Sequence, residues 1–288
     1  MIFVLFFTGV IIALFTPAVA YVTANQHCRV CLSNIGEVLH AYHEEHGHFP
    51  PTVIRGEDGK PWHSWRSLVL QEYLEEENYD LSQPWKAPGN KAARKFYPRW
   101  ITCFVAQGVH DKEEPIEESR YTTYVAVQGD DTAWRADGTP RSLKEIADPA
   151  NTAMVIELAN SKIQDIEPKD IQLDDLLSGR IAWDRLTVHK YDDGLVYPQP
   201  STNILFADGS VRRCIGIPTK EEIRQLFSIK EKPVTPANRH DRENYVFGDR
   251  RQVFAKQPVR AIVYYTWWTS LAFLFIAAIW PRRLSREQ

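Results

Sequence analysis

Residues 24–46 read ANQHCRVCLSNIGEVLHAYHEEH, with apolar side chains recurring every three or four positions. This spacing predicts an α-helix whose buried side carries Val30, Cys31, Ile35, Val38, Leu39 and Tyr42. Gly47 and the pair Pro50-Pro51 end the pattern. Because the preceding residues 1–22 contain no charged side chain, we predict one long helix with its first half in lipid. The second half should pack on a folded domain, and Pro17 should kink the first half.

Two uncharged apolar segments lie at the ends of the chain. We expect residues 1–22 to remain as a membrane anchor, because they are long enough to span a bilayer. Removal as a signal peptide is the alternative, since residues 18–20 have the small side chains of a cleavage site. As a helix, Ile262–Trp280 would span about 28 Å, and it has aromatic residues near both ends. We therefore expect a transmembrane helix over residues 261–281, followed by a basic tail over 282–288.

The residues between these segments have the composition of a folded domain. The chain has 288 residues, 44% of them apolar, which suffices for a sizeable core. We expect an α+β domain over residues 23–229 and a charged, proline-containing tether over 230–260. Within the domain, helical patterns occur in His63–Leu70 together with Tyr73-Leu74-Glu75, and in Thr219–Phe227. The net charge of −3 gives no basic footprint, so no nucleic-acid partner is expected.

Four short runs rich in β-branched and aromatic residues predict strands, at residues 122–127, 152–158, 202–207 and 210–215. Only Asp208-Gly209 separates the last two runs, which is a strong hairpin signal. We expect a type I′ turn with positive φ at both residues, and no catalytic role for Asp208. The predicted fold class is α+β, with a long N-terminal helix packed on a mostly antiparallel sheet with irregular insertions, plus a C-terminal transmembrane helix.

Histidines and acidic residues cluster near the end of the predicted helix. They are His40, His43, Glu44, Glu45, His46 and His48. Each step of three residues on a helix turns by about −60°, so His40 and His46 point about 120° apart. Zinc needs three or four converging ligands, and we therefore assign no metal ligand.

The sequence contains no signature of a serine hydrolase, a phosphate loop, a dinucleotide-binding site or a zinc protease. Glu157, in a predicted strand, is interpreted as a hydrogen-bonded structural carboxylate. We therefore expect no catalytic residue, no cofactor-binding residue and no enzymatic activity.

The chain has four cysteines, Cys28, Cys31, Cys103 and Cys214, which permit disulfides in three pairings if the domain is exported. The sequence does not select one of these pairings. Cys28-x-x-Cys31 falls on the predicted helix and not after a strand, which argues against a thioredoxin-type redox site. A single CxxC pair gives no support for a zinc ribbon.

Several short motifs resemble those of one bacterial family. They are Ala13–Val19, Cys28, Asn34-Ile35-Gly36, Leu39–His43, Gly47–Pro51, Ser64-Trp65-Arg66, Pro84-Trp85-x-x-Pro88-x-Asn90, Ile101-x-Cys103 and the strands with the Asp208-Gly209 hairpin. In these motifs the chain is similar to the pilin-like (type II secretion pseudopilin-like) exported proteins of planctomycetes that carry domain-of-unknown-function family 1559. The resemblance implies a pilin-like fold and no established biochemical activity. It also implies a bacterial membrane location, with the large domain on the extracytoplasmic side.

The chain departs from the pilin pattern before Ile11. It lacks the basic leader, the glycine cleavage site and the early glutamate of a prepilin. We therefore expect neither processing by prepilin peptidase nor assembly into long homopolymeric pili.

Together these features predict a non-enzymatic, membrane-anchored, pilin-like envelope or surface protein with a structural or partner-binding role. The expected partners are the lipid bilayer and other envelope or pseudopilin-like proteins. The alternative is an exported carbohydrate-binding module or enzyme that uses the Trp-rich segment 62–100, with Trp62, Trp65, Trp85 and Trp100. A deep pocket lined by two or more of these side chains beside paired carboxylates would favour the alternative, whereas a flat sheet face with the tryptophans buried would favour a structural role.

Overall fold

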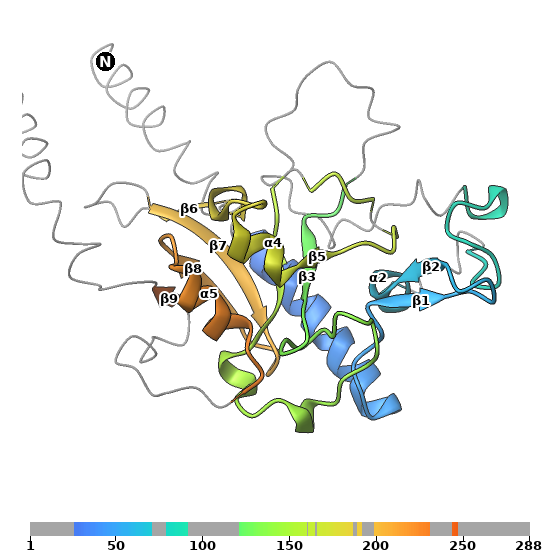
Figure 1. Cartoon of the computed structure of the whole chain (residues 1–288), viewed down its shortest axis with the longest axis horizontal. Coiled ribbons are helices and arrows are strands. Elements are labelled where there is room, and N and C mark those ends of the chain that lie inside the picture. The colour runs from blue at the N-terminus through green and yellow to red at the C-terminus, as the bar shows by residue number, and fades with distance from the viewer. Residues whose placement is uncertain are drawn as a thin grey trace, which may run out of the picture.

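The computed structural model describes residues 26–70, 79–91, 121–159, 161–164, 166–186, 189–191, 199–230 and 244–246. Within these ranges the chain is a mixed α and β structure, as expected (Figure 1). The expected anchor (1–22), the C-terminal segment (261–281) and most of the tether (230–260) lie outside the described residues. None of the helices that the described residues form is long and apolar enough to span a membrane.

A helix over residues 26–46, which we name the long helix, confirms the amphipathic pattern (Figure 1, blue). Its buried positions are Cys28, Cys31, Leu32, Ile35, Gly36 and Leu39. The prediction was wrong for Val30, which is 58% exposed, and it omitted Leu32. The buried side of the helix is formed by positions 28, 32, 35 and 39. Position 30 is two residues from both 28 and 32, a rotation of about 200°, so its side chain points away from the buried side. Gly47 ends the helix with a φ of +78°.

The main sheet has seven strands among the described residues. They are β3 (Tyr124–Gln128), β4 (Ala153–Glu157), β5 (Ile171–Gln172), β6 (His189–Tyr191), β7 (Gln199–Phe206), β8 (Val211–Ile215) and β9 (Asn244–Val246). Their spatial order is β5-β3-β4-β7-β8-β9, and β6 also pairs with β7. β5 and β9 are parallel to their neighbours, and all other pairs are antiparallel. The predicted strands and the mostly antiparallel sheet are therefore confirmed, whereas β5, β6 and β9 were not predicted.

The sheet has two distinct ends, because neighbouring strands alternate in direction. β3 and β7 begin where β4, β8 and β9 finish, and we name this the Ile215 end. The opposite end, named the hairpin end, holds the turn between β7 and β8. Tyr124 lies at the Ile215 end and donates its hydroxyl proton to Cys28 O at 3.2 Å. His40 lies against Gly209 at the hairpin end. The long helix therefore runs from the Ile215 end to the hairpin end.

The sheet lies between two helical layers. The long helix packs on the face that carries Tyr124 and Leu205. α4 (Leu173–Ser178) and α5 (Lys220–Phe227) cover the face that carries Ile156 and Phe206 (Figure 1). The helix predicted at residues 219–227 is thus confirmed as α5, whose N-cap is Thr219 in a capping box with Glu222. The 3-10 helices η3 (Leu143–Glu145), η4 (Pro149–Asn151) and η5 (Trp183–Leu186) lie in the connections.

A small two-stranded unit precedes the main sheet in the chain. β1 (Val53–Arg55) pairs with β2 (Pro61–Ser64), which leads into α2 (Trp65–Val69). The helix predicted over residues 63–75 therefore begins two residues later than expected, at Trp65, and residues 71–78 lie outside the described residues. Its first two residues are extended because they pair with β1. The segment that follows, residues 79–91, ends in η1 (Pro88–Lys91).

The hairpin between β7 and β8 is confirmed, but its turn type was predicted wrongly. Gly209 has a φ of +84°, whereas Asp208 is not among the described residues with positive φ. Gly209 N donates to Phe206 O at 3.0 Å, and Phe206 N donates to Ser210 O at 2.9 Å. This pattern is a three-residue loop, in which a type I turn is followed by a left-handed glycine. Asp208 stabilises it by accepting from Ser210 N at 2.9 Å.

Candidate functional site

Trp65 and Arg66, at the start of α2, both reach the carboxylate of Asp170, which immediately precedes β5. Arg66 Nη1 lies 2.7 Å from Asp170 Oδ1, and Trp65 Nε1 donates to Oδ2 at 3.1 Å. The backbone N–H of Ala126, in β3, donates to Oδ1 at 2.8 Å. This carboxylate therefore ties α2, β3 and the segment before β5 together.

The Arg66–Asp170 ion pair is buried, with side chains 3% and 0% exposed. Arg66 Nη2 also donates to the carbonyls of Glu167 at 2.9 Å and Lys169 at 2.8 Å. Burial raises the pKa of the Asp170 carboxyl, and the charge of Arg66 opposes part of that rise. Since both charged groups are enclosed and hydrogen-bonded, the pair has the geometry of a structural element and not of an open reactive site.

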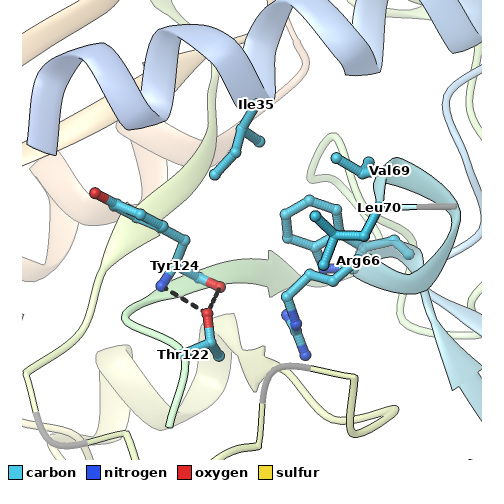
Figure 2. Close-up of a pocket in the computed structure, with 7 residues that line it drawn as sticks. Ile35, Arg66, Val69, Leu70, Thr122 and Tyr124 are labelled. Carbon is cyan, nitrogen blue, oxygen red and sulfur yellow. Dashed lines mark hydrogen bonds between the residues drawn. The ribbon is translucent and has the colours of Figure 1, made fainter. Parts of the chain in front are cut away.

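A small hollow lies beside this network (Figure 2). It is lined by Ile35, Trp65, Arg66, Val69, Leu70, Thr122 and Tyr124. Its volume of about 10 Å³ is close to the minimum for one water molecule. The Thr122 hydroxyl is engaged with the backbone of Tyr124, accepting from its N–H at 3.1 Å and donating to its carbonyl at 3.2 Å (Figure 2). The space bounded by these residues is too small for an organic ligand.

Glu157, the last residue of β4, is fully buried. Its carboxylate accepts the backbone N–H of Asn203 at 2.8 Å and the side-chain Nδ2 of the same residue at 3.3 Å. These bonds join β4 to β7 at the level where Tyr124 pairs with Glu157. The geometry is that of a hydrogen-bonded structural carboxylate.

The histidines of the long helix make separate contacts. His43 Nε2 accepts the N–H of Leu143 at 3.0 Å. The ring of His40 packs edge-on against Phe49, with centroids 5.7 Å apart, whereas His46 is exposed. Within the described ranges, no group of three or more His, Cys, Asp and Glu side chains is placed to hold a metal ion.

The segment over residues 79–91 is organised by Asn90, which is 0% exposed. Asn90 Nδ2 donates to the carbonyls of Asp80 at 3.0 Å and Pro84 at 3.1 Å, and its Oδ1 accepts Asp80 N at 2.7 Å. Trp85 N donates to Trp62 O at 3.1 Å, which fixes this segment to β2. The Pro84-Trp85-x-x-Pro88-x-Asn90 motif therefore specifies a loop structure.

Two of the tryptophans considered for carbohydrate binding lie in the core, since Trp65 is 0% exposed and Trp85 is 7% exposed. Trp62 is half-buried, and its indole lies so close to Gly56 that a β-carbon there would be 1.9 Å away. Trp100 lies outside the described residues.

Cys28 is disulfide-bonded, whereas Cys31 and Cys214 carry thiols. Cys103, the remaining cysteine of the sequence, lies outside the described residues. Burial raises the pKa of Cys31 to about 11, with a smaller contribution from the charge of Glu157. Burial also raises the pKa of Cys214. Both thiols are therefore protonated at neutral pH and are poor nucleophiles.

Asp170 is the main residue that the sequence analysis missed. Its segment, Pro168-Lys169-Asp170, has the composition of an ordinary polar loop. The available signal was indirect, because an arginine beside a buried tryptophan in α2 requires a nearby anion or several carbonyls. No local feature shows which of the many carboxylates supplies it.

A family model described as "Protein of unknown function (DUF1559)" matches residues 25–180, which is more than half of the chain. No curated protein matches the chain. No solved structure matches it either.

Proposed function

This chain belongs to the DUF1559 family of proteins of unknown function, and on that premise we propose that it is a non-enzymatic, membrane-anchored, pilin-like envelope protein. Its domain would have a structural or partner-binding role. One observation carries the proposal: charged and polar side chains of the family motifs form hydrogen bonds and ion pairs inside the domain and are not presented to a ligand. Arg66 is buried against Asp170, and Asn90 holds its own loop. Residues arranged in this way stabilise a scaffold.

An extracytoplasmic location is supported by the disulfide at Cys28, because disulfides persist in oxidising compartments. The apolar segments at residues 1–22 and 261–281 support anchoring at both ends. The motifs shared with planctomycete pilin-like proteins support the finer assignment, with other envelope or pseudopilin-like proteins as partners. The long helix packed on an antiparallel sheet is consistent with that assignment.

The alternative, a carbohydrate-binding module or enzyme using residues 62–100, has less support. Sugar-binding platforms present exposed aromatic faces, whereas Trp65 and Trp85 are buried.

The test of anchoring uses the full-length chain expressed in a bacterium. We expect it to stay with the membrane after alkaline carbonate extraction. In intact spheroplasts, external protease should digest residues from about 25 to 259, because the domain lies between two spans. An extractable protein, or a mature N-terminus at Tyr21, would contradict retention of the first segment.

A second test concerns assembly. Because residues 1–22 contain no glutamate, the purified protein should not form long filaments by itself. Negative-stain electron microscopy that shows filaments of this protein alone would contradict this expectation.

A further inference from the structure

The long helix places the N-terminal apolar segment close to the Ile215 end of the sheet. Val22 is the last residue of that segment, and Gln26 is the first described residue of the helix. Four residues of chain span at most about 14 Å. The start of the helix is at the Ile215 end, because Cys28 O accepts the Tyr124 hydroxyl there. If residues 1–22 are in lipid, this end of the sheet lies next to the bilayer.

β9 directs the C-terminal part of the chain toward the same end. It pairs parallel with β8, with Arg213 opposite Asn244 and Ile215 opposite Val246. Since β8 runs toward the Ile215 end, β9 also finishes there. The chain beyond Val246 contains the second apolar segment, Ile262–Trp280. The long helix begins and β9 finishes at this same end of the sheet, and these are the described elements nearest in the chain to the two apolar segments.

The exposed side chains at this end suit a membrane interface. Ile217 follows β8 and is 66% exposed, which is the highest exposure among the large apolar side chains of the described residues. Lys162 lies in the loop after β4, is exposed, and has its Nζ 5.1 Å from the centroid of the Tyr121 ring. The loop is held in place because Ile163 O accepts Thr122 N at 2.8 Å. An apolar side chain, a cation and an aromatic ring form the combination found at the lipid headgroup level.

We propose that the Ile215 end of the sheet rests on the lipid bilayer, with Ile217 at the headgroup boundary and Lys162 beside the lipid phosphates. This orientation rests on the proposed membrane anchoring. It directs the hairpin end, with His40 and Gly209, away from the membrane. The opposite orientation would require residues 23–25 to carry the chain along the whole length of the sheet.

The test measures depth in the membrane with nitroxide probes on the full-length chain. The chain is reconstituted into vesicles of phosphatidylethanolamine and phosphatidylglycerol, and probes are attached at Ile217→Cys, Lys162→Cys or Glu45→Cys. Glu45 is exposed near the end of the long helix that lies at the hairpin end and serves as the matched control. The parent chain is labelled in parallel, because Cys31 and Cys214 are thiols.

We expect the ratio of oxygen to nickel-complex accessibility to be several-fold higher at positions 217 and 162 than at position 45, because oxygen concentrates in lipid. An equal or higher ratio at position 45, in a chain that floats with the vesicles, would overturn the orientation and leave the anchoring intact. A chain that does not float would overturn the anchoring itself, and the orientation with it.

A second measurement tests the role of Ile217. Ile217→Ser should lower the ratio reported at position 162, because the apolar contact that holds this end on the bilayer is removed. Leu81→Ser, at another exposed apolar residue, should leave that ratio unchanged. An unchanged ratio in Ile217→Ser would overturn the insertion of Ile217.

Discussion

A β-carbon added to Gly36 would lie 2.8 Å from Leu205 Cδ1, so the long helix approaches β7 through a glycine. The same β-carbon would be 3.4 Å from the carbonyl oxygen of Gly209. Any larger residue at position 36 would therefore have to displace the Leu205 side chain or move the helix away from the β7–β8 hairpin. This contact gives a physical reason for the glycine in the Asn34-Ile35-Gly36 motif.

Gly36→Ala should lower the free energy of unfolding by about 1–3 kcal/mol through overpacking. Because alanine is the better helix former by about 1 kcal/mol, a net loss would identify the steric contact as its cause. The measurement is urea denaturation of the full-length chain in detergent. Glu37→Ala, at the exposed neighbouring position, should change stability by no more than about 0.5 kcal/mol. An unchanged or more stable Gly36→Ala variant would contradict the close approach.

Arg66→Met should destabilise the domain by about 3–5 kcal/mol, because it leaves the buried Asp170 carboxylate without its counter-charge. Combining Arg66→Met with Asp170→Leu should recover part of this loss, since no isolated charge then remains. The unfolding free energies of the parent chain, both single variants and the double variant are compared in a double-mutant cycle. The matched control is Glu221→Gln, which removes an exposed ion pair with Arg224 and should cost at most about 1 kcal/mol. If the loss of stability in the double variant equals the sum of the losses in the two single variants, Arg66 and Asp170 are not energetically coupled.

Much of this architecture could be predicted from local patterns. The long helix, α5, β3, β4 and the hairpin each have a periodicity or turn signal of their own. The turn type was wrong because Asp-Gly also occurs in three-residue loops, where only the glycine has positive φ. Val30 was misplaced because a helix with several apolar residues fits more than one choice of buried side.

The remaining errors depend on tertiary contacts. β9 has three residues and is a strand because β8 offers an edge. His63 and Ser64 fit a helical pattern but are extended because β1 pairs with them. The ion pair joins residues 104 positions apart, and composition gives no signal for such a distance in the sequence. Here the packed structure, and not local preference, selects the conformation.

Cys28→Ser should lower stability by about 2–5 kcal/mol, which is the usual effect of losing a native disulfide. Thiol labelling provides the complementary measurement. In the native oxidised chain, iodoacetamide should react slowly at Cys31 and Cys214 because burial keeps both thiols protonated. After unfolding without reductant, two thiols should react rapidly. Rapid native labelling at Cys31, or four reactive thiols after unfolding, would contradict the assignment.

Acid should weaken the contact around His63. Its Nε2 lies 3.0 Å from Leu81 O and its Nδ1 lies 2.6 Å from the Tyr79 hydroxyl. Burial lowers the pKa of His63 below 6.5, against smaller opposing effects of the Leu81 carbonyl and Asp80. A histidine whose folded pKa is lower than its unfolded pKa stabilises the fold fully above about pH 6.5. That contribution is lost as the pH falls through the folded pKa.

The pH prediction is tested by comparing unfolding free energies at about pH 7.5 and 5.5. His63→Gln should lose less stability on acidification than the parent chain, because glutamine does not titrate. His46→Gln, at an exposed position, should keep the slope of the parent. Equal slopes for His63→Gln and the parent would exclude His63 as a source of acid sensitivity.

Gly209→Val should destabilise the β7–β8 hairpin for two reasons. Gly209 has a φ of +84°, a conformation that costs about 1 kcal/mol or more for a residue with a β-carbon. Valine tolerates this conformation less well than an unbranched residue does, because its side chain is branched at the β-carbon. In addition, a β-carbon at this position would lie 3.3 Å from the His40 ring, so that ring must also shift by a few tenths of an ångström. The melting temperature should fall, and amide exchange should speed up at Leu205, which pairs with Val211.

Asp208→Asn separates the structural role of this turn from a chemical one. The Asp208 carboxylate accepts Ser210 N at 2.9 Å and Ser210 Oγ at 2.6 Å, and an asparagine Oδ1 accepts the same protons. Asp208→Asn should therefore melt close to the parent chain and keep membrane association and partner binding. Asp208→Ala, which removes the acceptor, should lower the melting temperature. A catalytic or ligand-binding carboxylate would behave differently, because asparagine would preserve the fold and abolish the activity. If Gly209→Val melts like the parent chain, or if Asp208→Asn folds normally but loses all partner binding, the interpretation of Asp208-Gly209 as a purely structural turn is wrong.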